Sequence, residues 1–198
     1  MYAASADPWQ LLTRWYEHRK YAITLALLPH RHYRHAFEPG CSIGTLTQRL
    51  AHRCDAITAA DVAADALRRA DRRLRTAGVR ERVRLVRQSL DDPWPAVDFD
   101  LIVLSEVGYY LHADTLRATL DRELAQRPGA TLITAHWRHL VSDYPIGGDQ
   151  VHDIVAATTN VQLVGGYRDR DVVIDVFSIG AAVSVAEREG VPGSSRIP

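Results

Sequence analysis

Residues 38–44 read Glu38-Pro39-Gly40-Cys41-Ser42-Ile43-Gly44 (EPGCSIG) and place two glycines four positions apart. The preceding HYRHAF (32–37) predicts a short strand that runs into this loop. GTLTQRLAHRC (44–54) predicts a short helix directly after it. A strand–loop–helix unit of this kind presents free backbone N–H groups to a ligand. The stretch therefore predicts a ligand-binding loop, and its surroundings decide which ligand fits.

Beyond this loop, strand-like apolar runs alternate with helical periodicity, which predicts a doubly wound parallel sheet. The predicted strands are DAITAAD (55–61), RVRLVRQSL (82–90), FDLIVLSEV (99–107) and ATLITAHW (130–137). The stretch NVQLVGGYRDRDVVIDVFSI (160–179) instead predicts two antiparallel strands joined by a short polar turn. We therefore expect one α/β domain over residues 1–183, with a seven-stranded, mostly parallel sheet that ends in an antiparallel hairpin.

The two ends of the chain lie outside this alternation. DPWQLLTRWYEHRKYAITLALLP (7–29) predicts one or two helices, with Asp7 as N-cap and Pro8 at the first helical position. We expect residues 1–33 to form a helical cap. Residues 184–198 finish with EREGVPGSSRIP, and we expect a disordered tail there.

Composition and charge exclude several classes of protein. The 198 residues carry 24 basic and 24 acidic side chains, so the chain has no net positive charge that would attract nucleic acid. No apolar run approaches the roughly 20 residues of a membrane span, and no signal-peptide core is present. Cys41 and Cys54 form neither a CxxC motif nor a zinc spacing. We therefore expect a cytoplasmic protein with reduced thiols and no metal; its oligomeric state stays open.

Asp61 narrows the choice of ligand. It ends the second predicted strand, 23 residues after Glu38, where a carboxylate accepts hydrogen bonds from ribose hydroxyls. A dinucleotide fingerprint needs glycine at Ser42, whose side chain keeps the backbone too far from a pyrophosphate. A cofactor with a ribose and no phosphates fits better. The alternative, a nicotinamide-dependent reduction, predicts protection by NADH against thermal unfolding, and we expect none.

These motifs and their order resemble class I S-adenosylmethionine (SAM) dependent methyltransferases. EPGCSIG matches the first motif of that superfamily with Ser42 in place of its middle glycine, and ITAAD matches the second through Asp61. FDLIVLSEV matches the fourth motif. More closely, DPW, WYEHRKYAITLALLP, FEPGCSIG, LSEVGYYL, AHWRH and DYPIGGDQVH are similar to the nodulation protein S (NodS-like) N-methyltransferases. The resemblance extends over roughly residues 7–179.

The resemblance implies SAM as cofactor and S-adenosylhomocysteine (SAH) as product. Tyr16 and Lys20 would lie over the cofactor as a lid, and Gln88-Ser89 replaces the pair that usually includes an adenine-binding acid, which leaves the adenine contact open. The implied cofactor-binding residues are Tyr16, Lys20, Glu38, Gly40, Cys41, Gly44, Asp61, Val62, Ser89, Leu90, Ser105 and Glu106.

The acceptor side is predicted at the carboxyl ends of the fourth and fifth strands. Methyl transfer requires an unprotonated nucleophile held in line, which a nearby proton acceptor assists. We expect Glu106, Tyr110 and His136 to be catalytic, and acceptor contacts from Tyr109, Tyr110, His136, Arg138, Asp143 and His152. Structural roles are the alternative for these side chains: Glu106 as a turn cap, the tyrosines as rim packing and His136 as a hydrogen-bonded core residue.

In the founding family members, the substrate is the free amino group of a deacetylated chito-oligosaccharide. The resemblance therefore implies a small acceptor, with N-methylation of an amino sugar or glycoconjugate amine as the leading expectation. O-methylation of another small metabolite and a non-catalytic SAM-fold binding protein are the alternatives.

Overall fold

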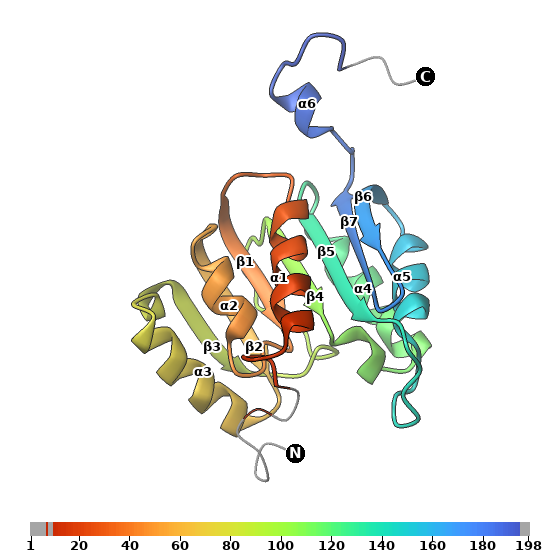
Figure 1. Ribbon diagram of the computed structural model, residues 1–198. Coiled ribbons are helices and arrows are strands. Elements are labelled where there is room, and N and C mark those ends of the chain that lie inside the picture. Colours follow the sequence, from red (N-terminus) through yellow and green to blue (C-terminus); the bar gives the residue numbers. More distant parts are fainter. Residues whose placement is uncertain (1–6, 8–9, 195–198) are drawn as a thin grey trace.

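The computed structural model describes residues 7 and 10–194 and contains a seven-stranded sheet with helices on both faces (Figure 1). The strand order is β3-β2-β1-β4-β5-β7-β6. Neighbouring strands are parallel from β3 to β5, whereas β7 is antiparallel to both β5 and β6. The predicted sheet with its terminal hairpin is confirmed. The strands are β1 (Tyr33–Pro39), β2 (Cys54–Asp61), β3 (Val83–Arg87), β4 (Leu101–Ser105), β5 (Thr131–Trp137), β6 (Val161–Arg168) and β7 (Val172–Ile179).

Helices cover the two faces of the sheet in separate groups (Figure 1). One face carries α1 (Trp15–Leu27), α2 (Thr45–Leu50) and α3 (Ala64–Thr76), and the other carries α4 (Ala113–Leu124) and α5 (Gly148–Ala156). Successive residues of a strand point to opposite faces. Val103 of β4 accordingly belongs to the same buried cluster as Leu50 and Leu74, while Ile102 belongs to the other cluster, with Leu120 and Val155.

The order of the strands creates a switch point between β1 and β4. The chain leaves β1 towards β2 on one side, and β4 lies on the other side. The loops that follow β1 and β4 therefore diverge over opposite faces, and open α/β sheets bind their ligands in the crevice that results. A short 3-10 helix, η2 (Gly108–Tyr110), follows β4 at this edge, and a second, η1 (Arg80–Arg82), precedes β3.

The N-terminal helix begins later than the sequence predicts. Asp7 accepts hydrogen bonds from the backbone N–H groups of Leu11 and Leu12 at 2.9 and 3.0 Å, four and five residues further on, whereas an N-cap accepts from the second or third helical residue. Arg14 is the N-cap of α1 instead. Gln10 then adopts a φ of 57°, and α1 starts only at Trp15. A left-handed residue cannot continue a right-handed helix. The prediction for Pro8 lies outside the described residues.

The structure describes the C-terminal segment as far as residue 194. It contains a short helix, α6 (Val185–Arg188), whose N-cap Ser184 accepts a hydrogen bond from the backbone N–H of Glu187 at 3.1 Å. Figure 1 shows α6 standing out from the sheet. The Arg188 guanidinium reaches the His30 ring at 2.7 Å. Residues 195–198 lie outside the described part of the chain, and the disordered tail stays a prediction. Among the described helices, none has the length and apolar character that crossing a bilayer requires.

Candidate active site

A cavity of about 800 Å³ opens at the carboxyl ends of β1, β2 and β4 and is covered by the first half of α1. It lies at the switch point of the sheet, and its volume is within the range of small-molecule sites. The structure brings most of the predicted cofactor residues into its lining: Tyr16, Lys20, Glu38, Gly40, Cys41, Asp61, Val62, Ser89, Leu90, Ser105 and Glu106.

The conformation of the loop after β1 requires glycine at position 40. This residue has a φ of +76°, and a Cβ placed there would lie 2.6 Å from Val107 Cγ2. Ser42 also has a positive φ, 51°, and the backbone N–H of Cys41 is bound to the Ala60 carbonyl at 2.9 Å. Glycine therefore lets the loop after β1 contact the segment after β4 directly, and backbone lines this part of the cavity.

Gly44 was expected to contact the cofactor, but it does not line the cavity. It is the N-cap of α2, with a φ of 76°. A Cβ at this position would lie 3.0 Å from the Cβ of Ala70 on α3. The second glycine of the motif therefore allows α2 to pack closely against α3. A glycine at this position is expected both for close helix packing and for ligand contact, so the sequence alone does not distinguish the two roles.

Two carboxyl groups face the same end of the cavity. Asp61 accepts hydrogen bonds from the backbone N–H groups of Ser42 at 2.9 Å and Ala63 at 2.8 Å. Burial raises the pKa of Asp61, and these two bonds oppose the rise. Each Asp61 oxygen retains a second lone pair for a ligand. Burial raises the pKa of Glu38 to about 8, and its Oε2 atom has no hydrogen-bond partner among the described residues.

Glu106 lies where β4 ends and is held by three donors. Its Oε1 atom accepts a hydrogen bond from the Lys20 ammonium at 2.7 Å. Its Oε2 atom accepts from the backbone N–H of Trp137 at 3.1 Å and from the Tyr109 hydroxyl. The φ of Glu106 is 55°, a left-handed conformation that costs a non-glycine residue about 1–2 kcal/mol. Such strain is concentrated at functional sites.

Lys20 is buried in the cavity wall, with its side chain 2% exposed. Besides Glu106, its ammonium pairs with Glu17 at 3.0 Å. The rings of Tyr16 and Tyr21 lie over the ammonium at 5.1 and 5.5 Å. Burial disfavours this cation, but Glu106 and Glu17 outweigh the penalty, so the pKa of Lys20 lies above its ordinary value. Lys20 is therefore a permanent cation beside Glu106.

Aromatic rings line the cavity beside Glu106. Tyr109 stacks on Tyr144 with ring centroids 4.5 Å apart, and Tyr110 meets Tyr144 edge-on at 4.8 Å. Tyr110 is 46% exposed at the cavity mouth. Trp137 packs edge-on against Tyr16 at 5.1 Å. Rings beside a carboxylate suit a ligand that is cationic or carries a sugar ring.

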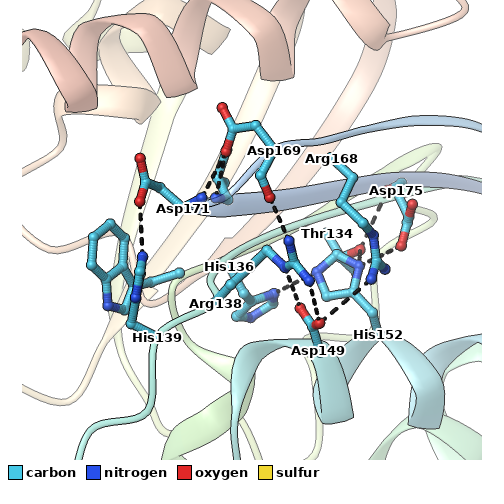
Figure 2. A network of polar contacts seen from close by, with 12 residues as sticks. Thr134, His136, Arg138, His139, Asp149, His152, Arg168, Asp169, Asp171 and Asp175 are labelled. Carbon is cyan, nitrogen blue, oxygen red and sulfur yellow. Dashed lines mark hydrogen bonds and ion pairs between the residues drawn. The ribbon is translucent and has the colours of Figure 1, made fainter.

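The structure does not bring His136 and His152 into the cavity lining. His136 is fully buried, and its Nε2 atom accepts the backbone N–H of Gly108 at 3.1 Å. Because an N–H group can only donate, the proton of His136 is on Nδ1, which meets His152 Nε2 at 3.1 Å. His152 Nδ1 in turn lies 2.6 Å from Asp175 Oδ2 (Figure 2). Burial lowers the pKa of His136 strongly, so the ring is neutral.

This buried chain supports η2, which carries Tyr109 and Tyr110. His136 also packs edge-on against Tyr109, with centroids 5.3 Å apart. We therefore assign His136 to positioning these tyrosines instead of to proton transfer at the acceptor. The sequence placed it correctly at the end of β5 but could not show that its ring points behind the cavity wall.

Arg138 and Asp143 also lie away from the cavity lining. Arg138 forms two 2.8 Å contacts with the carboxylate of Asp149 and donates to the carbonyl of Asp169 (Figure 2). Asp143 is exposed and accepts a bond from the Ser142 hydroxyl at 3.2 Å. Arg138 thus ties the segment after β5 to the β6–β7 turn, and Asp143 lies on the surface of that segment.

Several lining residues were not selected from the sequence. Arg14 and Glu17 precede Lys20 at three-residue steps, so helical periodicity could have found them. Tyr144 lies in the DYPIGGDQVH stretch, whose polar and aromatic residues suggested a loop over the acceptor, whereas Asp171 enters from the β6–β7 turn with no local signal. The full set is Leu11, Arg14, Glu17, Tyr21, Ser42, Thr45, Leu46, Ala63, Gln88, Val107, Leu111, Trp137, Val141, Tyr144 and Asp171. Within residues 7 and 10–194, no group of three or more His, Cys, Asp or Glu side chains is arranged to hold a metal ion.

Comparison with known proteins assigns the family. The family model described as Nodulation protein S (NodS) matches residues 2–144. The chain belongs to the NodS family. Nodulation protein S of Rhizobium tropici is 36% identical over 110 residues, 54% of this chain and 44% of that protein. Its counterpart from Bradyrhizobium diazoefficiens is 37% identical over 106 residues, 53% of this chain and 49% of that protein. The chain spans about half the length of these curated relatives.

Solved structures share the fold over most of the chain. The N-methyltransferase NodS from Bradyrhizobium japonicum WM9, in complex with SAH, has a TM-score of 0.77 and 25% identity, covering 88% of this chain and 92% of that one. A Pseudomonas syringae protein described as a methyltransferase is 36% identical, with a TM-score of 0.68, covering 83% of this chain and 99% of that one. The predicted NodS resemblance and class I methyltransferase fold are confirmed.

Proposed function

We propose that this NodS-family protein transfers the methyl group of SAM to a small acceptor and releases SAH. The observation that carries the proposal is the cavity at the switch point, where the Gly40 loop and the doubly anchored carboxylate of Asp61 form one end. The SAH complex of the Bradyrhizobium japonicum relative supports the same cofactor here, since the two folds correspond over most of both chains.

The cofactor end of the cavity has polar groups that suit SAM. Asp61 would accept the ribose hydroxyls, and Glu38 would face the methionyl ammonium with an oxygen that lacks a partner among the described residues. The buried Tyr16 hydroxyl also lines the cavity and is likewise unpartnered within the described part of the chain, so it is available to a ligand. Ser89 and Leu90 would border the adenine. The bound cofactor supplies an electrophilic methyl group, and the protein holds it in line with the acceptor.

At the acceptor end, we propose an amine as the nucleophile, with an amino sugar or glycoconjugate amine as the substrate class. Glu106 offers a carboxylate to an N–H group, and Tyr109, Tyr110 and Tyr144 offer ring faces on which a sugar or an ammonium packs. Three relatives support this choice: the Bradyrhizobium japonicum protein is described as an N-methyltransferase, and the two curated relatives are nodulation proteins. Glu106 and Tyr110 remain the proposed catalytic residues.

Two measurements test the proposal. Isothermal titration should show saturable binding of SAM and SAH, and a screen of amine-bearing sugars with isotope-labelled SAM should yield a methylated amine by mass spectrometry. Absence of SAH binding would refute the enzyme. Binding without transfer to any acceptor would instead identify a SAM-fold binding protein, and a methyl group on oxygen would replace the amine assignment.

A further inference from the structure

One buried cation stands out in the wall of the cavity. Lys20 is the only lysine in a chain whose other 23 basic side chains are arginines. Its ammonium touches Glu106 at 2.7 Å and Glu17 at 3.0 Å, and the rings of Tyr16 and Tyr21 close two further sides. Both carboxylates line the same cavity.

We propose that Lys20 is a positioning residue that holds the Glu106 carboxylate in place for the acceptor. This inference rests on the proposed function, in which Glu106 meets the nucleophile. Three donors fix Glu106: Lys20 on one oxygen, with the Tyr109 hydroxyl and the Trp137 N–H on the other. Of the three donors, only Lys20 carries charge, and charge-assisted hydrogen bonds are roughly twice as strong as neutral ones.

The shape of the site explains why the position holds lysine instead of arginine. A lysine ammonium is a compact point charge with three donors, whereas a guanidinium is a planar fork that pairs with one carboxylate side-on. Here one nitrogen reaches two carboxylates from different elements, Glu17 within α1 and Glu106 after β4. The Lys20 side chain is 2% exposed, and its ammonium is enclosed by these two carboxylates and by the rings of Tyr16 and Tyr21.

Lys20 is also in a position to couple the helical cap to the chemistry. It belongs to α1, which covers the cavity, while Glu106 belongs to the sheet edge beneath. The contact joins residues 86 positions apart in the chain. A substitution that breaks this contact therefore affects the acceptor end of the cavity, while the Asp61 end keeps its own backbone donors.

Replacing Lys20 alone would change both the stability of the fold and the position of Glu106, and the two effects could not be told apart. Lys20→Met leaves the buried Glu17 carboxylate and the partly buried Glu106 carboxylate, 8% and 23% exposed, without their shared cation. An uncompensated buried charge is strongly destabilising. Adding Glu17→Gln removes one of the two charges and separates the effects. The double variant K20M/E17Q should regain much of the stability lost in K20M, while Glu106 still lacks its charged donor.

The decisive measurement compares K20M/E17Q with the wild type in three assays: urea unfolding, SAH titration and steady-state kinetics with the amine identified by the screen. We expect stability close to wild type, SAH affinity within a few-fold, and kcat/KM for the acceptor lowered about 10- to 100-fold, the loss expected for one charged hydrogen bond. Recovery of all three quantities would refute the positioning role, because Lys20 would then serve only to neutralise Glu17.

Arg127 provides a matched control. It is a buried cation on the far side of the sheet, 3.0 Å from the Glu123 carboxylate, with the rings of Trp94 and Phe99 at 5.3 and 5.5 Å. Arg127→Met should lower stability, as K20M does, and leave the acceptor kcat/KM of the remaining folded protein unchanged. An equal kinetic loss in R127M would show that any buried ion pair has this effect, and would overturn the inference.

A readout independent of turnover comes from the uniqueness of Lys20. Protein labelled with ¹⁵N-lysine gives a single side-chain ammonium resonance. Glu106→Gln should shift this resonance, and R127M should leave it unchanged. If the wild type binds SAH but transfers no methyl group, the proposed function fails, and this signal decides the pairing: a shift in E106Q upholds it, and an unchanged signal refutes it.

Discussion

At the ends of β1 and β2, the cavity wall consists of groups that are near one another in the chain, whereas at the end of β4 it consists of groups that are far apart. The Asp61 carboxylate is anchored by N–H groups of residues 19 and 2 positions away, at Ser42 and Ala63. Glu106 has one donor close in the chain, Tyr109, 3 positions away, but its other two donors, Lys20 and Trp137, lie 86 and 31 positions away.

The two ends of the cavity therefore differ in how their geometry is maintained. Backbone donors in a tight loop give the proposed cofactor end a fixed geometry that depends on few side chains. The proposed acceptor end depends on side chains from α1, β4, β5 and the segment after β5. Substitutions at the first end should therefore change cofactor affinity, and substitutions at the second should change acceptor kinetics.

The largest effect is expected on stability, at Gly40, where the loop after β1 contacts the segment after β4. Gly40→Ala places a Cβ 2.6 Å from Val107 Cγ2 at a φ of +76°, so overpacking and backbone strain together should lower the free energy of unfolding by about 2–5 kcal/mol. Urea unfolding measures this. Gly78→Ala is the control, because its φ is +69° and its Cβ would meet nothing within 4 Å, so only the strain remains. Equal losses in both variants would show that the contact with Val107 is unimportant.

The next largest effect is expected at Asp61. Asp61→Ala should weaken SAH binding by about 1–3 kcal/mol, because buried donors and ribose hydroxyls would lose their acceptor. The acceptor KM should not change. Asp55→Ala on the same strand is the control, since that side chain is 70% exposed and remote from the cavity lining. Titration calorimetry checks both, and an unchanged SAH affinity in the Asp61 variant would reject the ribose assignment.

Tyr109→Phe should have a smaller effect, confined to the other end. It removes the hydroxyl that donates to Glu106 while keeping the ring stacked on Tyr144. Losing one hydrogen bond of about 0.5–1.5 kcal/mol should lower the acceptor kcat/KM roughly 2- to 12-fold and leave SAH affinity unchanged. If the loss appeared in SAH affinity instead, the division of the cavity into two ends would be wrong.

The smallest effect concerns acid stability at the β6–β7 turn. The N–H groups of Val172 and Asp171, together with Arg19 of α1, hold the pKa of Asp169 well below its ordinary value. A lowered carboxyl pKa stabilises the fold above the unfolded value of about 4, and this contribution is lost as pH falls further. Asp169→Asn should therefore cost up to about 1 kcal/mol at pH 7 and less in acid. Urea unfolding of both proteins at pH 7 and below the unfolded pKa of about 4 measures the difference in stability. An equal loss of stability at the two pH values would contradict the assignment.

Local patterns in the sequence determined the sheet, its hairpin and the cofactor end. Alternating and continuous apolar runs mark strands, and helical periodicity marks the elements between them, because side-chain direction repeats with the backbone geometry. The order of those elements then implies the switch point, and with it the neighbourhood of Gly40 and Asp61. The late start of α1 could not be predicted, because the left-handed Gln10 and the extended Arg14 interrupt the helix without changing the spacing of apolar residues.

Only the tertiary structure decided which candidates reach the cavity. His136 and Ser105 both lie near the carboxyl ends of neighbouring strands, yet His136 is buried behind the cavity wall and Ser105 lines the cavity. The pairing of Lys20 with Glu106, and the entry of Tyr144 and Asp171, depend on how distant segments cross over the sheet. Such contacts follow from the path of the whole chain, and no local spacing encodes them.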